Sequence, residues 1–175
     1  MFASIRRARA DIALMGTLLP AAERLAQADG IPEPGAEHLL LAALDLSDGV
    51  AKRALGAVGG DADALRAALT QGHDDALRAI GVQADDVAIG AAIPAPVKPS
   101  GPLRAQGSMQ EAFQRAVQVA KDDGRTLGSG HLLLAVIEPE HGTVARALTR
   151  LGIDRTDPVS YTHLRAHETD SYLVC

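Results

Sequence analysis

The stretch "EHLLLAALDLSDGVAKRALGAVGGD" at residues 37–61 recurs as "GHLLLAVIEPEHGTVARALTRLGID" at residues 130–154. When His38 is aligned with His131, 11 of the 24 positions in 38–61 are identical to those in 131–154. The identical positions include a His-Leu-Leu-Leu-Ala segment, an Arg-Ala-Leu segment and the glycines that follow each of them. An ungapped match with glycines at the same positions indicates an internal duplication.

Both copies have the pattern of a group of short helices. In the first copy, residues 37–46 and 49–58 are predicted helices, and Gly59-Gly60 ends the second of them. Asp61 is expected to cap a further helix in "DADALRAALTQG", and a short helical piece, "DDALRAIG", follows. The repeat therefore predicts about four helices in each copy, too short to be stable alone.

A helix is also expected before each shared block. In the first copy it lies within "ADIALMGTLLPAAERLAQADG", residues 10–30, where Pro20 predicts either a kink or a helix that starts near Leu18. In the second copy Ser108 is the predicted N-cap, with Glu111 as its capping-box partner.

Composition favours an all-α fold. Hydrophobic residues make up 47% of the 175 residues but aromatic residues only 2%, so the core must be built from Ala, Leu, Val and Ile. The net charge of −5 argues against nucleic acid as a partner, and no apolar run approaches the roughly 20 residues of a membrane span. With a single cysteine, a reduced cytoplasmic setting is expected.

These patterns divide the chain into four parts. The first repeat is expected at 12–88 and the second at 108–157. A segment rich in Pro and Gly, 89–107, reads as a linker. The second repeat is incomplete, because no capped helix follows Asp154 as one follows Asp61. We therefore expect exposed apolar surface near Leu148 and Leu151.

The tail at 158–175 contains the pair of residues whose spacing most resembles a metal-binding site. His163 and His167 stand four residues apart, a spacing that can chelate zinc on a helix, and a metal-dependent enzyme is the alternative that this motif suggests. However, residues 159–175 resemble a translated sequencing adaptor: they can be back-translated as a transposase end, a read adaptor, an eight-base index and a flow-cell adaptor. We interpret the tail as non-native, and we expect no metal and no cofactor.

The repeated block resembles the double Clp-N repeat that precedes the ATPase modules of Clp unfoldases of the ClpA, ClpB and ClpC type. The residues that carry this resemblance are "GAEHLLLAAL" at 35–44 and "GSGHLLLAVI" at 128–137, each followed by a Gly, an Arg-Ala-Leu helix and a closing Gly. The resemblance covers about residues 12–157. It implies an all-α domain of eight helices, in which two pseudo-twofold repeats have about four helices each, that docks substrate or adaptor proteins for an unfoldase and has no catalysis of its own.

The same resemblance points to four candidate binding residues, at the starts of the shared helices: Glu37, His38, Ser129 and His131. In ClpC-type domains the motif glutamate helps to hold the guanidinium of phosphoarginine-marked substrates. Glu37 keeps that position, whereas the second copy has Gly130, so a symmetric two-site reader is not expected. From the residues alone, Glu37 is a first-turn acid and each histidine is a partly buried residue that bonds a neighbouring backbone group.

The chain lacks the motifs of common enzymes. None of its lysines lies in a Gly-x-x-x-x-Gly-Lys-Ser/Thr phosphate loop, and no Gly-x-Ser-x-Gly elbow is present. The leading interpretation is a non-enzymatic Clp-repeat protein of the free-standing kind found in high-GC bacteria. The alternative is the N-terminal part of a complete Clp ATPase.

Overall fold

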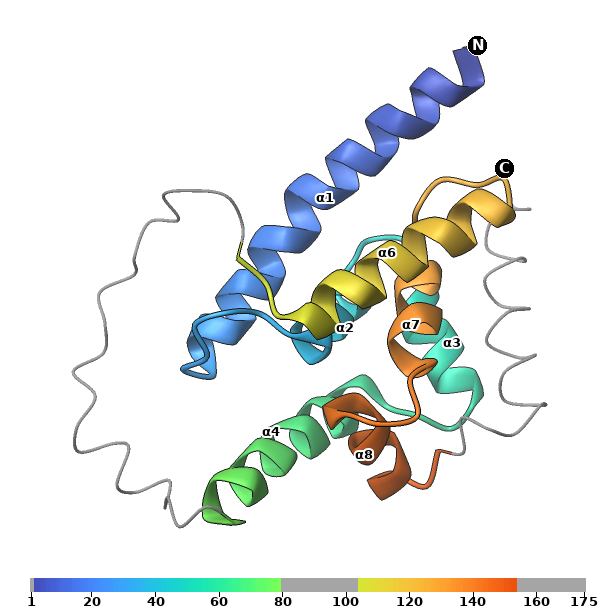
Figure 1. Ribbon diagram of the computed structural model, residues 1–175. Helices are drawn as coiled ribbons and strands as arrows, with labels where there is room; N and C mark the ends of the chain where they lie inside the picture. The colour runs from blue at the N-terminus through green and yellow to red at the C-terminus, as the bar shows by residue number, and fades with distance from the viewer. Residues whose placement is uncertain (1, 80–103, 154–175) are drawn as a thin grey trace.

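The computed structural model describes residues 2–79 and 104–153 of the chain (Figure 1). Within these residues every regular element is a helix, which confirms the predicted all-α class. The helices are α1 (Phe2–Ala28), α2 (Ala36–Leu44), α3 (Val50–Ala57), α4 (Ala62–Ala79), α6 (Gly107–Asp122), α7 (Ser129–Ile137) and α8 (Thr143–Arg150).

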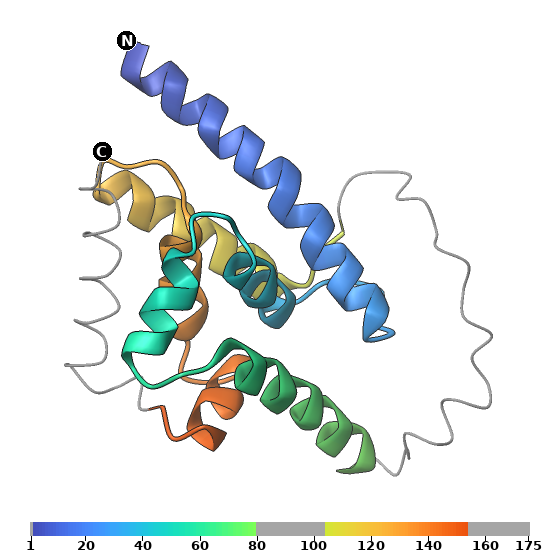
Figure 2. The same cartoon turned by 180° about the vertical axis from the view of Figure 1, so that it is seen from behind.

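The two copies of the His-Leu-Leu-Leu-Ala segment form the centre of the fold. They lie in α2 and α7, which pack against each other. All nine residues of α7 are buried, as are His38–Leu44 of α2. A helix that is apolar on every side is stable only when other helices surround it. Accordingly α1 packs on α2, α6 packs on α7, and α4 of the first repeat packs on α8 of the second (Figures 1 and 2).

Matching turns close the two repeats. Gly59 and Gly152 have positive φ angles of 78° and 71°, a conformation that glycine adopts without a steric penalty. The next amide then donates back into the helix, from Gly60 to the carbonyl of Leu55 (2.9 Å) and from Ile153 to the carbonyl of Leu148 (3.0 Å). The local structure at the end of α3 thus recurs at the end of α8, as expected of a duplication.

The helix that α1 forms is longer than predicted. It begins at Phe2, well before Leu18, and Pro20 lies inside it. Proline removes one backbone hydrogen bond from a helix. Leu18, Ala22 and Ala26 are at most 1% exposed, so packing of this face against the core offsets that loss.

Two further predictions of helix ends are wrong. The two predicted pieces after Asp61 form one helix, α4, because a glycine such as Gly72 costs a helix only about 1 kcal/mol, and Leu65, Ala68 and Leu69 bury the face before it. Ser108 is not an N-cap, since α6 has Gln106 at that position. The Ser108 hydroxyl instead accepts a hydrogen bond from the amide of Ala36 (3.3 Å).

The prediction that Asp61 caps α4 is confirmed: its Oδ1 accepts from the amides of Asp63 (3.0 Å) and Ala64 (2.9 Å).

The expected exposure of the second repeat is also corrected. Leu148 is only 2% exposed and Leu151 is partly buried against the core. The reason is that α4 packs on α8, so a helix of the first repeat covers the end of the second. The zinc-like tail motif lies outside the described residues.

Candidate functional site

Glu37 lies in the first turn of α2, and its side chain is 19% exposed. The side chain folds back over the start of the helix: a Cβ placed on Gly35 would lie only 2.6 Å from Oε1 of Glu37. The same oxygen is 3.5 Å from Nδ1 of His38. Because position 35 is glycine, the carboxylate can rest against the backbone at the positive end of the helix dipole.

A cavity of about 390 Å³ opens beside this carboxylate, between the starts of α2 and α6 and the turn that joins α7 to α8. Three acidic residues line it, Glu37, Glu111 and Glu138, together with one arginine, Arg115. The arginine donates to both oxygens of Glu138, at 2.5 and 2.7 Å. These hydrogen bonds and the positive charge of Arg115 hold the pKa of Glu138 below its ordinary value, although partial burial acts in the opposite direction.

The charge of this cavity is therefore acidic. Arg115 and Glu138 neutralise each other, which leaves the carboxylates of Glu37 and Glu111 in the wall. Its other polar lining includes the hydroxyls of Ser108 and Thr143. Such a cavity suits a cationic side chain that donates hydrogen bonds to these carboxylate and hydroxyl oxygens. Sequence reasoning missed the Arg115–Glu138 pair, because the two residues lie 23 positions apart, one within α6 and the other at the C-cap of α7.

The two candidate histidines have matching structural roles. Each side chain is completely buried, and its Nδ1 accepts a hydrogen bond from a backbone amide three residues earlier: Gly35 to His38 (2.9 Å) and Gly128 to His131 (3.1 Å). A neutral imidazole that accepts at Nδ1 carries its proton on Nε2. The predicted bond to a neighbouring backbone group is confirmed, but burial is complete rather than partial.

Two aspartates complete this arrangement. Nε2 of His38 lies 3.3 Å from Oδ2 of Asp29, and Nε2 of His131 lies 3.8 Å from Oδ2 of Asp123. Each aspartate directly precedes the positive-φ glycine that ends the first helix of its repeat. That shared Asp-Gly step is a sequence signal from which both partners could have been found.

Ser129 is the first residue of α7, which contacts α3 of the first repeat; we call this contact the α3–α7 joint. The Ser129 side chain is completely buried. Its amide donates to Oδ2 of Asp48 (2.9 Å) and its Oγ donates to Oδ1 of the same carboxylate. Oγ in turn accepts from the amide of Ala51 (2.9 Å). Ser129 therefore caps α3 of the first repeat rather than its own helix.

The duplication relates the α3–α7 joint to a second joint, where the start of α2 meets α8. An offset of 93 residues places Ala36 where the second copy has Ser129, and His141 where the first copy has Asp48. Alanine has no hydroxyl, so the Ser129–Asp48 pair has no counterpart at the start of α2. The acidic cavity lies at this second joint, lined by both Ala36 and His141. Of the four candidate residues only Glu37 has an exposed side chain; His38, Ser129 and His131 present no exposed surface to a ligand.

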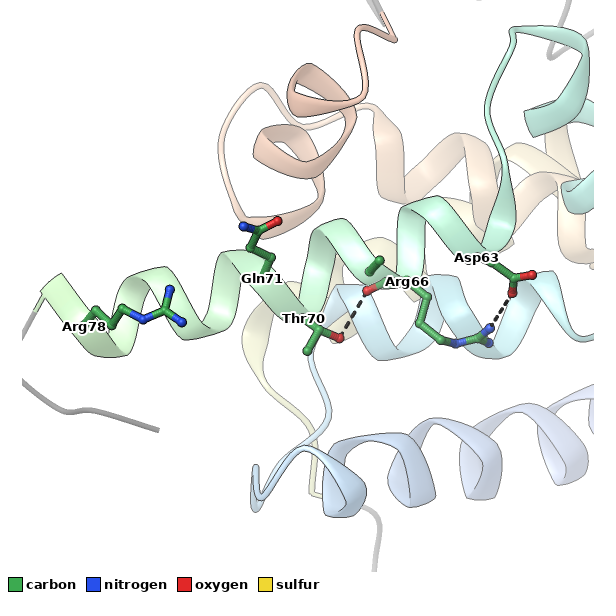
Figure 3. Close-up of a pocket in the computed structure, with 6 residues that line it drawn as sticks. Asp63, Arg66, Thr70, Gln71 and Arg78 are labelled. Atoms are coloured by element: carbon green, nitrogen blue, oxygen red, sulfur yellow. Dashed lines mark hydrogen bonds and ion pairs between the residues drawn. The ribbon is translucent and has the colours of Figure 1, made fainter. Parts of the chain in front are cut away.

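A larger hollow, of about 560 Å³, is a weaker candidate. Six residues of one helix, α4, line it, and Figure 3 shows their side chains along a single face. Arg66 pairs there with Asp63 (3.4 Å), and the Thr70 hydroxyl donates to the carbonyl of Arg66 (3.2 Å). A surface with walls from one helix does not enclose a ligand.

Fold and site together define an all-helical double-repeat domain with an acidic cavity at one of its two joints. Residues 15–93 match the family model of the Clp repeat (R) N-terminal domain. This match covers the first repeat and agrees with the resemblance that the sequence carries. The second repeat has the same glycine turn and the same buried histidine as the first.

A search of the curated proteins finds no match to this chain. None of the helices in the described residues is long and apolar enough to cross a membrane. In the same part of the chain, no group of three or more His, Cys, Asp and Glu side chains is arranged to hold a metal ion.

Proposed function

We propose that this domain binds substrate or adaptor proteins for a Clp ATP-dependent unfoldase, and that the acidic cavity beside Glu37 takes an arginine side chain of the bound protein. The family match over residues 15–93 supports the first part, since Clp N-terminal domains generally bind such partners. The observation that carries the second part is the Glu37 carboxylate, which is held over Gly35 in the wall of a 390 Å³ cavity.

The guanidinium is the group that best fits this wall. It is planar, always charged, and can donate two parallel hydrogen bonds to one carboxylate. Glu111 adds a second negative charge on the same cavity, whereas the one arginine there is already paired with Glu138. A phosphoarginine ligand would bring a phosphate into this acidic surrounding and would depend on the Ser108 and Thr143 hydroxyls to hold it.

Only one such site is expected in each chain. The second repeat has Gly130 at the position of Glu37, and Asp48 occupies the corresponding joint. A binding isotherm for an arginine peptide should therefore give a stoichiometry of one.

The test uses fluorescence anisotropy with labelled peptides that differ in a single residue: arginine, phosphoarginine or citrulline. We expect citrulline, which lacks the positive charge, to bind at least about tenfold more weakly than arginine. Glu37→Gln should remove this preference. Asp63→Asn, which neutralises a side chain that is 93% exposed on α4, is the control for the loss of one negative charge. If Glu37→Gln binds the arginine peptide as the unaltered protein does, the proposed site is wrong; a stronger response to phosphoarginine would assign the marked form as the ligand.

A further inference from the structure

A second cavity, of about 290 Å³, lies on the other side of Glu37. It is formed where the end of α1 meets α2, α4 and α8, so it combines three helices of the first repeat with one of the second. Two residues, Glu37 and Thr143, line both this cavity and the acidic one. The two cavities are therefore neighbours that share these two residues.

The chemistry of the second cavity differs from that of the first. Ile31, Leu41 and Leu69 give it apolar walls. Asp29 and Arg146, which also line it, have opposite charges, so this pair adds no net charge to that of the shared Glu37. Such a lining favours an uncharged side chain over a second cationic one.

The proximity of the two cavities suits a single extended peptide. Successive residues of an extended chain advance about 3.3 Å, so a peptide with one side chain beside Glu37 presents the next one or two side chains within reach of the neighbouring cavity. A volume of about 290 Å³ is ample for one leucine, methionine or phenylalanine side chain.

We infer that the second cavity takes an apolar side chain that neighbours the arginine, so that the recognised segment is an arginine next to a leucine, methionine or phenylalanine. This inference rests on the proposed function, because the arginine fixes the position of the peptide. Moving one such apolar side chain out of water should tighten binding by about tenfold or more relative to glycine at the same place.

Gly72 offers a way to fill the cavity without harming the fold. It lies in α4 and lines the cavity, and a Cβ added there would meet only Arg150 Nη1, at 3.8 Å. Leucine is also a better helix former than glycine, so Gly72→Leu should fold at least as well as the unaltered protein. Gly56→Leu in α3 is the matched control, since a Cβ at Gly56 meets nothing within 4 Å and the position lies outside both cavities.

The experiment measures Kd by anisotropy for four peptides: arginine or citrulline, each flanked by leucine or by glycine. We expect leucine to tighten binding of the arginine peptide about tenfold to the unaltered protein and to Gly56→Leu, and by less than about twofold to Gly72→Leu. The ratio of the Kd for the citrulline peptide to the Kd for the arginine peptide should stay the same in all three proteins.

Each other outcome has a definite meaning. If leucine gives no advantage, or if Gly72→Leu keeps the full advantage, the inference about the second cavity is overturned while the arginine site stands. If citrulline binds as well as arginine but leucine dependence is lost in Gly72→Leu, the apolar cavity is supported and the proposed arginine site fails.

Discussion

Ser129 and Asp48 lie 81 residues apart and connect the two repeats through a single carboxylate. Asp48 accepts from the amide and the hydroxyl of Ser129 and from the amide of Val50 (3.2 Å), while the Ser129 hydroxyl accepts from Ala51. The first turns of α3 and α7 are thus capped by each other's repeat. Capping interactions of this kind each stabilise a protein by about 1 kcal/mol.

Replacing Asp48 by alanine should lower the free energy of unfolding by about 2 kcal/mol, because the amides at the starts of both helices lose their acceptor. Urea denaturation followed by circular dichroism measures this change. Asp45→Ala is the control: Asp45 lies three residues away, its side chain is 66% exposed, and its ion pair with Arg66 should contribute less than about 0.5 kcal/mol. Equal effects of the two substitutions would contradict a special role for Asp48.

In each repeat a buried histidine in the first turn of the helix accepts a hydrogen bond from the amide of the N-cap residue. In a capping box a glutamine or glutamate three residues into the helix accepts from the N-cap amide, and here His38 does so for Gly35. His38→Leu should therefore cost about 2 kcal/mol, since it leaves a buried amide without its acceptor. His38→Gln keeps an acceptor and should cost less. If leucine and glutamine are equally destabilising in thermal unfolding, the hydrogen bond is unimportant and only shape matters.

Gly35 should control the position of Glu37. Its φ of −100° is open to any residue, but a Cβ would lie 2.6–2.9 Å from the Glu37 carboxyl group, which would have to move. Gly35→Ala should consequently weaken binding of an arginine peptide about fivefold, equivalent to about 1 kcal/mol, with little change in stability. In the Glu37→Gln background the same substitution should have no further effect on Kd. Additive losses would show that alanine disturbs something other than Glu37.

The Arg115–Glu138 pair predicts a modest dependence of stability on pH. The pKa of Glu138 is lowered in the folded protein, mainly by its hydrogen bonds from Arg115, so the pair stabilises the fold above the ordinary carboxyl pKa of 4.5 and loses this effect as the pH falls through the lowered value. Both side chains are nearly half exposed, and the contribution should be below about 1 kcal/mol after solvent screening. The gap in unfolding free energy between the unaltered protein and Arg115→Gln should be present at pH 6 and become smaller as the pH falls below 4.5. A gap that does not change with pH would assign the effect to packing of the arginine stem.

The sequence was most informative where the signal is local. The apolar segments of α2 and α7, the glycines that end α3 and α8, and the cap at Asp61 are decided by residues within a few positions, and all were predicted. Pro20 and Gly72 misled because they weaken a helix only by an amount that packing of a buried face can exceed.

The site was less accessible to such reasoning. Glu37 could be singled out through the family resemblance, but the cavity beside it depends on α6 and on the turn before α8, which fold next to α2 from more than 60 residues away. The Asp48–Ser129 and Arg115–Glu138 pairs likewise join distant segments. The division into 12–88, 89–107, 108–157 and 158–175 stays a prediction.

The packing of α4 on α8 and of α2 on α7 has a consequence for how such a chain could arise. A lone repeat would leave the central face of its own α2 uncovered, and a second identical molecule could cover it only as a symmetric dimer. Both joints of that dimer would have to carry the same residues. Fusion into one chain removes this constraint, so that one joint can specialise in holding the halves together through Asp48 while the other keeps Glu37 and is free to evolve toward a partner.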